Sequence, residues 1–444
     1  MSKLSLVGVV LLKCHYFKGI RRTQAPIDSL PTEIVCQILT SAIVETDTLR
    51  RGNVHRIHKP QLAAVCRHWR DIIVNTPHLW TFIELSPQWS IRSLLKAHVE
   101  RSQECPLDIV CQGFRFEEEK ADGYDEALMD IMMPTVHRWR SLAITNDFEM
   151  CKVAVARLGR PVFPLLTHLS ISRNRTHRPK FLHPECVPAL KHLEACMTAV
   201  THEFPPALEE LTIGCSDFPE AIPRSLRIPS VQGLKTLSFR GQTNLWRIQR
   251  DSIHLPLVTR LSFDVTYAEQ LLRVLSAPSL THVNYLQRYD ETLFTAFNWI
   301  PSKWETVREL RLKIAWHYTR EDYHAELTAL CLATPKVRSV EIMAQHLDEL
   351  FKDCRQAQYP IDRWAHLEKF TVIGGVHHLN EAGRYIVPWL QQRRDMGKSA
   401  LKLSFLVKGD KAQLQTIVLD DIGQYCDGGD LRVEETIAGY WAAS

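Results

Sequence analysis

The sequence predicts an α/β protein in which a short all-helical module precedes a curved, irregular solenoid of parallel strands. Three observations lead to this prediction. Apolar residues recur at helical spacing between residues 27 and 86, and a short apolar phrase recurs from residue 139 to residue 410. Polar residues alternate with the apolar ones inside that phrase, which indicates strands with one buried face.

The first expected helix starts near Pro31. Proline suits the first turn of a helix because its missing N–H costs nothing there, and Glu33 complements the positive end of the helix dipole. The following apolar residues recur at helical spacing and are expected to form one apolar face: Ile34, Ile38, Leu39, Ala42 and Ile43.

A second amphipathic helix is expected before Pro77, with Cys66 inside it as a small buried hydrophobe rather than a nucleophile. Its apolar positions are Leu62, Val65, Cys66, Trp69, Ile72 and Ile73. The charged stretch from Glu45 to Lys59 is expected to form a solvated loop between the two helices. Two such helices cannot bury both faces alone, so they either dock onto a partner or cap the next domain.

Three segments of this module resemble an F-box, the helical module that docks a protein onto the Skp adaptor of a cullin–RING ubiquitin ligase. They are Ser29-Leu30-Pro31-Thr32-Glu33-Ile34, Val65-Cys66-Arg67-His68-Trp69-Arg70 and Pro77-His78-Leu79-Trp80. The resemblance implies the following adaptor-binding residues: Leu30, Pro31, Ile34, Ile38, Val65, Cys66 and Trp69. The chain has 25 residues between Leu39 and Val65, which is more than the usual F-box pattern has.

The repeated phrase is a six-residue motif with apolar residues at its first, fourth and sixth positions. Clear copies span 166–171, 208–213, 234–239, 258–263, 280–285, 307–312, 337–342 and 367–372, and weaker ones span 139–144, 190–195 and 401–403. Most copies follow one another at 22 to 31 residues, the period of leucine-rich repeats. No single repeat can bury its own apolar strand face, so the repeats are expected to stack and the array to curve.

Helices are expected between the strands, for example over Ala268–Leu275 and Glu321–Cys331, with Pro278 and Pro335 ending them. The alternative is a doubly wound α/β sheet, whose strands are nearly continuous in Val and Ile because both of their faces are buried. Polar residues separate the apolar ones here, so one strand face is exposed and the horseshoe is favoured. The usual Asn or Cys that closes the strand turn is mostly absent, apart from Asn174, which predicts an irregular solenoid.

The stretch Ile91–Ser102 followed by Cys105–Ile109 resembles the helix–strand linker behind the F-box in a group of fungal F-box/leucine-rich-repeat proteins, and the layout from about residue 27 to 410 is similar to that group. The expected domains are a disordered leader at 1–26, the F-box at 27–86, a linker helix with the first irregular repeats at 87–138, the solenoid at 139–410 and a solvated acidic tail at 411–444.

Residues that alternate with the apolar ones on such strands line the concave face. Near the middle of the array the candidates for contact with a target are Arg240, Arg260, Asp264, His282, Asn284, Arg311 and Lys313. They mix cations, an acid and amides, which suits a polypeptide surface better than a nucleic acid. A basic loop from Arg173 to Lys180 is either a solvated loop or a site for acidic or phosphorylated segments.

Composition limits the class of protein. The 45% hydrophobic and 23% charged residues are ordinary for a folded soluble chain, and a net charge of +4 is too small to indicate nucleic-acid or membrane binding. The 12 cysteines form no C-x-x-C pair, so the reduced cytoplasm or nucleus is expected. Leu4–Leu12 resembles a short signal-peptide core without a cleavage site, and Asn174 would accept a glycan only in a secreted protein.

No catalytic motif is recognisable, so we expect a protein that is not an enzyme and needs no cofactor. The spacing of Cys186, His192 and Cys196, the best metal candidates, fits no standard zinc site, so no metal is expected either. The resemblance implies a substrate-recruiting subunit of an SCF-type ubiquitin ligase. Its partners would be a Skp-family adaptor, through it cullin and RING subunits, and a protein target. The alternative is a leucine-rich-repeat scaffold or receptor-like binding protein without a ligase role.

Overall fold

The computed structural model describes most of the chain between residues 30 and 435. The described residues are 30–48, 59–85, 92–112, 124–145, 157–159, 161–171, 182–196, 204–215, 231, 233–242, 253–266, 268–287, 301–313, 320–344, 347–351, 359–398, 401–408 and 431–435. The chain divides into two compact units, the first comprising residues 1–83, 89–108 and 438–444 and the second residues 84–88 and 109–437. The expected leader, Asn174 and the Arg173–Lys180 loop lie outside the described residues.

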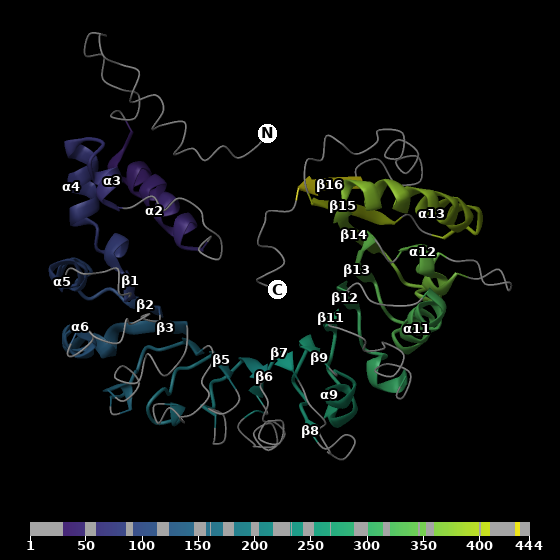
Figure 1. Ribbon diagram of the computed structural model, residues 1–444, viewed down its shortest axis with the longest axis horizontal. Coiled ribbons are helices and arrows are strands. Elements are labelled where there is room, and N and C mark those ends of the chain that lie inside the picture. Colours follow the sequence, from purple (N-terminus) through teal and green to yellow (C-terminus); the bar gives the residue numbers. More distant parts are fainter. Residues whose placement is uncertain are drawn as a thin grey trace, which may run out of the picture. The chain divides into compact units, whose positions relative to one another are not determined.

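Unit 1 is built from short helices (Figure 1). Its helices are α2 (Thr32–Thr48), α3 (Lys59–Ala63), α4 (Arg67–Asn75), the 3-10 turn η2 (Pro77–Trp80) and α5 (Arg92–Arg101). Two short strands, β1 (Phe82–Leu85) and β2 (Leu107–Gln112), run across the boundary between the two units. The helix expected in the linker over Ile91–Ser102 is thus present as α5.

Helix α2 has two apolar faces where the sequence predicted one. Val35, Leu39 and Ala42 are buried, and the first two of them lie in the core of unit 1. Ile34 is 41% exposed, and Ile38 is half-buried. Residues four apart lie on one side of a helix, so Ile34 and Ile38 form a second apolar strip beside the buried one.

The second expected helix is in fact two helices. The chain leaves α3 after Ala63 and enters α4 at Arg67, because Cys66 has an extended backbone with φ −156° and ψ 171°. The Cys66 thiol accepts a hydrogen bond from the backbone N–H of Trp69 at 3.4 Å and so caps α4. Apolar spacing continues through this break, which is why the sequence read as one helix. Helix α4 ends at Asn75, before Pro77, as expected.

Unit 2 contains a long parallel sheet. From β3 onward its strands lie in the order β3-β4-β5-β6-β7-β9-β11-β12-β13-β14-β15-β16. Their bounds are β3 (Trp139–Thr145), β4 (His168–Ile171), β5 (His192–Cys196), β6 (Glu210–Cys215), β7 (Thr236–Gln242), β9 (Arg260–Thr266), β11 (His282–Gln287), β12 (Glu309–Lys313), β13 (Ser339–Met343), β14 (Lys369–Gly375), β15 (Lys402–Lys408) and β16 (Leu431–Glu435). A separate two-stranded sheet pairs β8 (Ile253–His254) with β10 (Leu275–Ser276).

The repeated phrase accounts for the strands. Each clear copy contains a strand that starts two residues after the first apolar residue, as in Leu166 before His168. The first apolar residue is buried ahead of the strand, and the other two point into the core from within it; Leu261 and Phe263 on β9, for example, are 3% and 1% exposed. Phe263 stacks on Phe239 of the neighbouring strand at 5.9 Å, so successive copies form continuous apolar rows.

Helices cover one side of this sheet, along the convex edge of the strand arc (Figure 1). They include α6 (Tyr124–Met132), α9 (Ala268–Val274), α11 (Arg320–Ala333), α12 (Leu347–Leu350) and α13 (Val376–Asp395), with 3-10 turns η3 (Met133–Arg138), η8 (Pro301–Trp304) and η10 (Pro360–Arg363). Phe370 of β14 packs against Trp389 of α13 at 6.2 Å, which identifies the apolar strand face as the helix-covered one. The predicted fold, a helical module followed in the chain by a curved parallel sheet with a helical outer face, is confirmed.

One strand was not expected. The acidic tail read as a solvated end, yet β16 pairs in parallel with β15 over Leu403–Val407. Leu431 and Val433 take the same register as the apolar residues Leu403 and Phe405, so the alternation that marks the other strands also exists here. The many acidic residues around this stretch led us to expect a solvated tail instead of a strand.

Candidate functional site

The outer strip of α2 is the first candidate site. Pro31 and Ile34 are exposed and Ile38 and Leu30 are half-buried, so apolar side chains follow one another along the start of the helix. Leu30 also packs against the core of unit 1, which fixes the chain where it enters α2. Exposed apolar side chains in a row are suited to burial against another protein.

The other residues that the F-box resemblance assigns to the adaptor lie deeper. Val65 and Cys66 are half-buried and pack on the core of unit 1. Trp69 is only 3% exposed, and it packs in the same core as Ile72, Ile73 and Leu39. Its role in this structure is to hold the helices together, and its contact with an adaptor stays a prediction.

A tryptophan–histidine pair connects η2 to α5 within unit 1. The rings of Trp80 and His98 meet edge to face at 4.9 Å, and the Trp80 indole donates a hydrogen bond to the backbone oxygen of Ile73 at 2.7 Å. Two cations flank the Trp80 ring, with Lys59 Nζ at 5.3 Å and the Arg101 guanidinium carbon at 4.5 Å. Sequence reasoning did not single out His98, because a lone histidine in an amphipathic helix carries no specific signal.

Unit 1 should lose stability in acid because of this histidine. Burial, aided by the charge of Lys59, lowers the pKa of His98 from 6.5 to about 3. The folded state therefore binds fewer protons than the unfolded state, and stability falls as the pH drops from 6.5 toward 3, by at most about 1.4 kcal/mol per pH unit. We expect a loss of about 2–3 kcal/mol between pH 6.5 and 4.5, measured by hydrogen exchange of the amides of α4 and α5.

Substitution of His98 separates this effect from general acid unfolding. His98→Gln should flatten the pH dependence of protection in α4 and α5, although it also costs packing at every pH. The matched control is His78→Gln, because His78 is an exposed histidine of the neighbouring turn. An unchanged pH profile in His98→Gln would show that this histidine does not set the acid response.

The face of the sheet in unit 2 that none of the described helices covers, here called the open face, is the second candidate site. Two rows of polar residues run across the strands on this face, and the strand register aligns each of them. The Arg260 row comprises Ser141, His168, His192, Glu210, Thr236, Arg260, His282, Glu309, Ser339, Lys369 and Lys402. The Asn284 row comprises Ser170, Glu194, Thr212, Ser238, Ser262, Asn284, Arg311, Glu341, Thr371 and Ser404.

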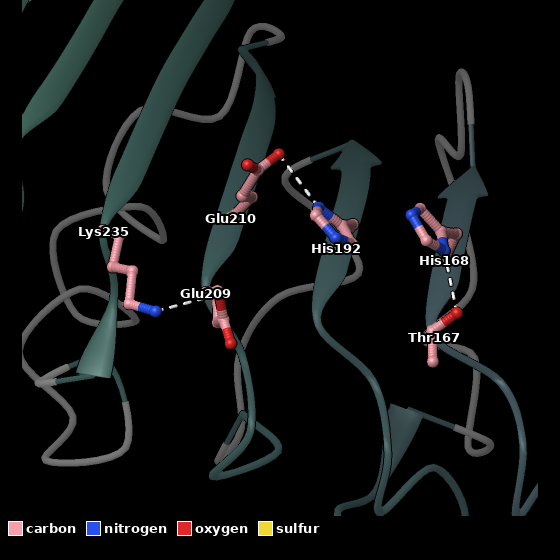
Figure 2. Close-up of polar contacts among 6 residues, drawn as sticks. All are labelled: Thr167, His168, His192, Glu209, Glu210 and Lys235. Carbon is pink, nitrogen blue, oxygen red and sulfur yellow. Dashed lines mark hydrogen bonds and ion pairs between the residues drawn. The ribbon is translucent and has the colours of Figure 1, made fainter.

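Histidines gather at the start of the Arg260 row (Figure 2). The rings of His168 and His192 stack at 4.1 Å with an interplanar angle of 10°. His192 Nδ1 lies 2.9 Å from a Glu210 carboxylate oxygen, and His168 Nδ1 lies 2.8 Å from the hydroxyl of Thr167. Each imidazole is thus engaged through Nδ1 by a neighbouring side chain.

This arrangement bears on the metal candidates. The carboxylate of Glu210 occupies the Nδ1 side of His192, while Cys186 lies half-buried in the connection before β5. Among the residues that the structure describes, no three His, Cys, Asp or Glu side chains converge as a metal site would require. The side chain of Cys196 is not among those described.

All predicted target-binding residues except Lys313 lie on the open face, and three of them form ion pairs there. Arg240 pairs with Glu194 at 2.9 Å, Arg311 with Glu341 at 2.9 Å and His282 with Glu309 at 3.1 Å. The remaining members are Asn284, which donates to the hydroxyl of Ser262 at 3.1 Å, half-buried Asp264 and exposed Arg260.

Lys313 differs from the sequence expectation. It is only 2% exposed, so its ammonium group is not presented on the open face. Lys313 is the last residue of β12 and aligns with Leu286 of β11. Burial raises the pKa of the nearby Glu341, which Arg311 and Lys313 oppose.

Comparison with protein families agrees with the geometry of unit 1. Residues 27–86 match the F-box-like family, so the chain carries an F-box-like domain, as expected of an F-box protein. The F-box part of the resemblance drawn from the sequence is thereby confirmed. Comparison of the chain with curated proteins finds no match. No helix in the described part of the chain is long and apolar enough to cross a membrane.

Proposed function

We propose that this protein is a substrate-recruiting subunit of an SCF-type ubiquitin ligase. The observation that carries the proposal is the F-box-like domain at residues 27–86, followed in the chain by a long solenoid whose open face is polar. F-box domains generally bind Skp-like adaptors. The adaptor would connect the chain to cullin and RING subunits, and the solenoid would hold a protein target.

The two candidate surfaces support one site for the adaptor and a separate site for the target. The strip of Pro31, Ile34 and Ile38 is apolar, as suits a permanent partner, whereas the open face of the sheet is polar, as suits a target that must leave again. The chain needs no catalytic residue or cofactor for this role, because holding a target near the ubiquitin carrier acts through effective concentration.

Further features of the proposal rest on the sequence. The period of the repeated phrase assigns the solenoid to the leucine-rich repeats, and the layout resembles the fungal F-box proteins of that class. Such a subunit would work in the cytoplasm or nucleus, where free thiols persist. The modest net charge of +4 supports a protein target and neither nucleic acid nor a membrane as partner.

The substitution Ile34→Asp tests adaptor docking without disturbing the core. Ile34 is 41% exposed and lies in the first turn of α2, where an aspartate complements the helix dipole, so the fold should persist. Burying the new carboxylate against an apolar partner should cost about 3 kcal/mol or more, which is roughly a 100-fold loss of adaptor affinity. Biolayer interferometry with purified Skp adaptor measures this loss.

The matched control is Leu94→Asp. Leu94 is an exposed apolar residue of α5 in the same unit, 36% exposed, and it is not among the predicted adaptor contacts. Adaptor affinity should stay unchanged in this variant. Equal affinities of wild type, Ile34→Asp and Leu94→Asp would rule out the α2 strip as the docking surface.

A further inference from the structure

Among the residues that the structure describes, the open face of the solenoid carries more unpaired cations than unpaired carboxylates. Its described carboxylates are engaged within the chain: Glu194 by Arg240, Glu210 by His192, Glu309 by His282 and Glu341 by Arg311. Asp264 likewise has a partner. The face therefore offers no free described carboxylate to a ligand.

Three cations of the Arg260 row have no carboxylate partner among the described residues. Arg260, Lys369 and Lys402 are exposed, and no described carboxylate lies within ion-pair distance of them. Lys369 acts on Glu341 only as the weakest of the cations around it, behind Arg311 and Lys313. Within the part of the chain that the structure describes, no carboxylate neutralises these three charges.

Two of these cations lie opposite each other on neighbouring strands. Lys369 of β14 and Lys402 of β15 are direct partners in the parallel register. Neighbouring strands lie about 4.8 Å apart, and like charges placed opposite each other on one face destabilise a sheet. An anionic group bound between the two ammonium groups would remove this repulsion.

The positions of the three cations define the length of the ligand. Four strand spacings separate Arg260 on β9 from Lys369 on β14, with Lys402 one strand further. At about 4.8 Å per strand the distance is roughly 19 Å, which six residues of an extended polypeptide span. The residues between them, among them His282, Glu309 and Ser339, add no unpaired charge.

A polypeptide fits these charges better than a nucleic acid does. Each strand of a nucleic-acid double helix carries a phosphate about every 3.4 Å along its axis, and three unpaired cations over such a distance would leave most phosphates without a partner. A protein segment with anionic side chains at two places, separated by a few neutral residues, leaves no charge unmatched.

We propose that the open face binds an acidic polypeptide segment that crosses the strands from Arg260 to the Lys369–Lys402 pair. The proposed function enters this proposal at one point only: it identifies the acidic segment as part of the target protein. Carboxylate and phosphate side chains share the required negative charge, and the experiment below distinguishes them.

The test uses the full-length protein and labelled peptides in fluorescence anisotropy. The probe is a Gly–Ser peptide with a pair of glutamates at each end; its counterparts carry phosphoserine or lysine at the same places. The glutamate or the phosphoserine peptide should bind, more weakly as salt is added, and the lysine peptide should not. Tighter binding of the phosphoserine peptide would assign the surface to phosphorylated targets, and tighter binding of the glutamate peptide to carboxylates.

The double variant Lys369→Gln/Lys402→Gln should weaken binding of the acidic peptide by roughly 2- to 30-fold, the range for two exposed ion pairs. Its melting temperature should not fall, because repulsion between the two lysines is removed; a purely structural role would lower it. The control Lys96→Gln/Lys191→Gln removes the same charge from exposed lysines on α5 and ahead of β5, and should bind like wild type.

The proposal is overturned if neither acidic peptide binds better than the lysine peptide, or if both double variants lose affinity equally. Adaptor binding measured on the same preparations keeps the two ideas apart. If the protein binds the adaptor but no acidic peptide, this inference is contradicted and the ligase role is not. Protein that binds acidic peptides through Lys369 and Lys402 but no adaptor supports this inference and contradicts the ligase role.

Discussion

Replacing Trp69 by alanine is expected to destabilise the helical unit by about 3–5 kcal/mol, the usual cost of truncating a buried tryptophan. Trp69 is 3% exposed and packs with Ile72, Ile73 and Leu39, so its removal leaves a cavity that the short helices around it cannot close. Hydrogen exchange in the full-length protein should show lost protection of α2 and α4. Adaptor binding should fall with it, because the strip proposed to bind the adaptor lies on α2.

The control for this result is Trp69→Phe, which keeps an aromatic ring in the core and should cost less. Strands of unit 2, such as β12 to β14, provide an internal reference for protection in the same sample. Loss of adaptor binding with full protection of α2 and α4 would contradict the packing role of Trp69. It would instead place the indole in direct contact with the adaptor.

Gly241→Ala is expected to destabilise the solenoid by about 3 kcal/mol or more. Gly241 has φ +109°, where side chains are strained, and an added Cβ would lie 2.2 Å from the backbone oxygen of Cys215. Cys215 is its partner on the neighbouring strand β6, so neither backbone can move away without breaking the sheet ladder. A lower melting temperature and loss of exchange protection in β6 and β7 measure the effect.

Two other glycines separate backbone strain from steric clash. Gly397 has φ +67° with no atom within 4 Å of an added Cβ, so Gly397→Ala should cost only the strain of about 1–2 kcal/mol. Gly233 would meet only ordinary contacts, the nearest at 3.8 Å, so Gly233→Ala should be close to neutral. Equal effects of all three substitutions would show that the approach to Cys215 is not what constrains Gly241.

The strands were predictable because their signal is local. Alternation such as Leu261-Ser262-Phe263 follows directly from one buried and one open strand face, and each copy carries it independently. The helices α9 and α11 were equally legible from their spacing. The fold class therefore follows from the sequence without knowledge of any long-range contact.

The polar contacts of the open face were not predictable, because they depend on register between repeats of unequal length. Arg240 reaches Glu194, 46 residues earlier in the chain, across the intervening strand β6, where Gly214 is the register partner of Arg240 and leaves the space free. The sequence offered Arg240 and Arg311 as free cations for a target, and both are paired. Lys369 and Lys402, for which the described residues provide no such pair, lie beyond the stretch that the sequence favoured.

In the helical unit, too, some features could not be predicted from the sequence. The spacing of Ile34, Ile38 and Leu39 fits one wide apolar face, and only the packing of α2 shows that Leu39 is buried while Ile34 is exposed. The break at Cys66 depends on a thiol that accepts a backbone hydrogen bond, which is not the usual role of a cysteine in a sequence pattern. The F-box resemblance was legible because it rests on residue identities rather than on periodicity.

The most direct test of this account is the binding of purified full-length protein to a purified Skp adaptor, measured by isothermal titration calorimetry beside an established F-box protein. We expect a one-to-one complex that forms with wild type and with Leu94→Asp and is lost with Ile34→Asp. Absence of binding by correctly folded wild-type protein, under conditions in which the established F-box protein binds, would contradict it.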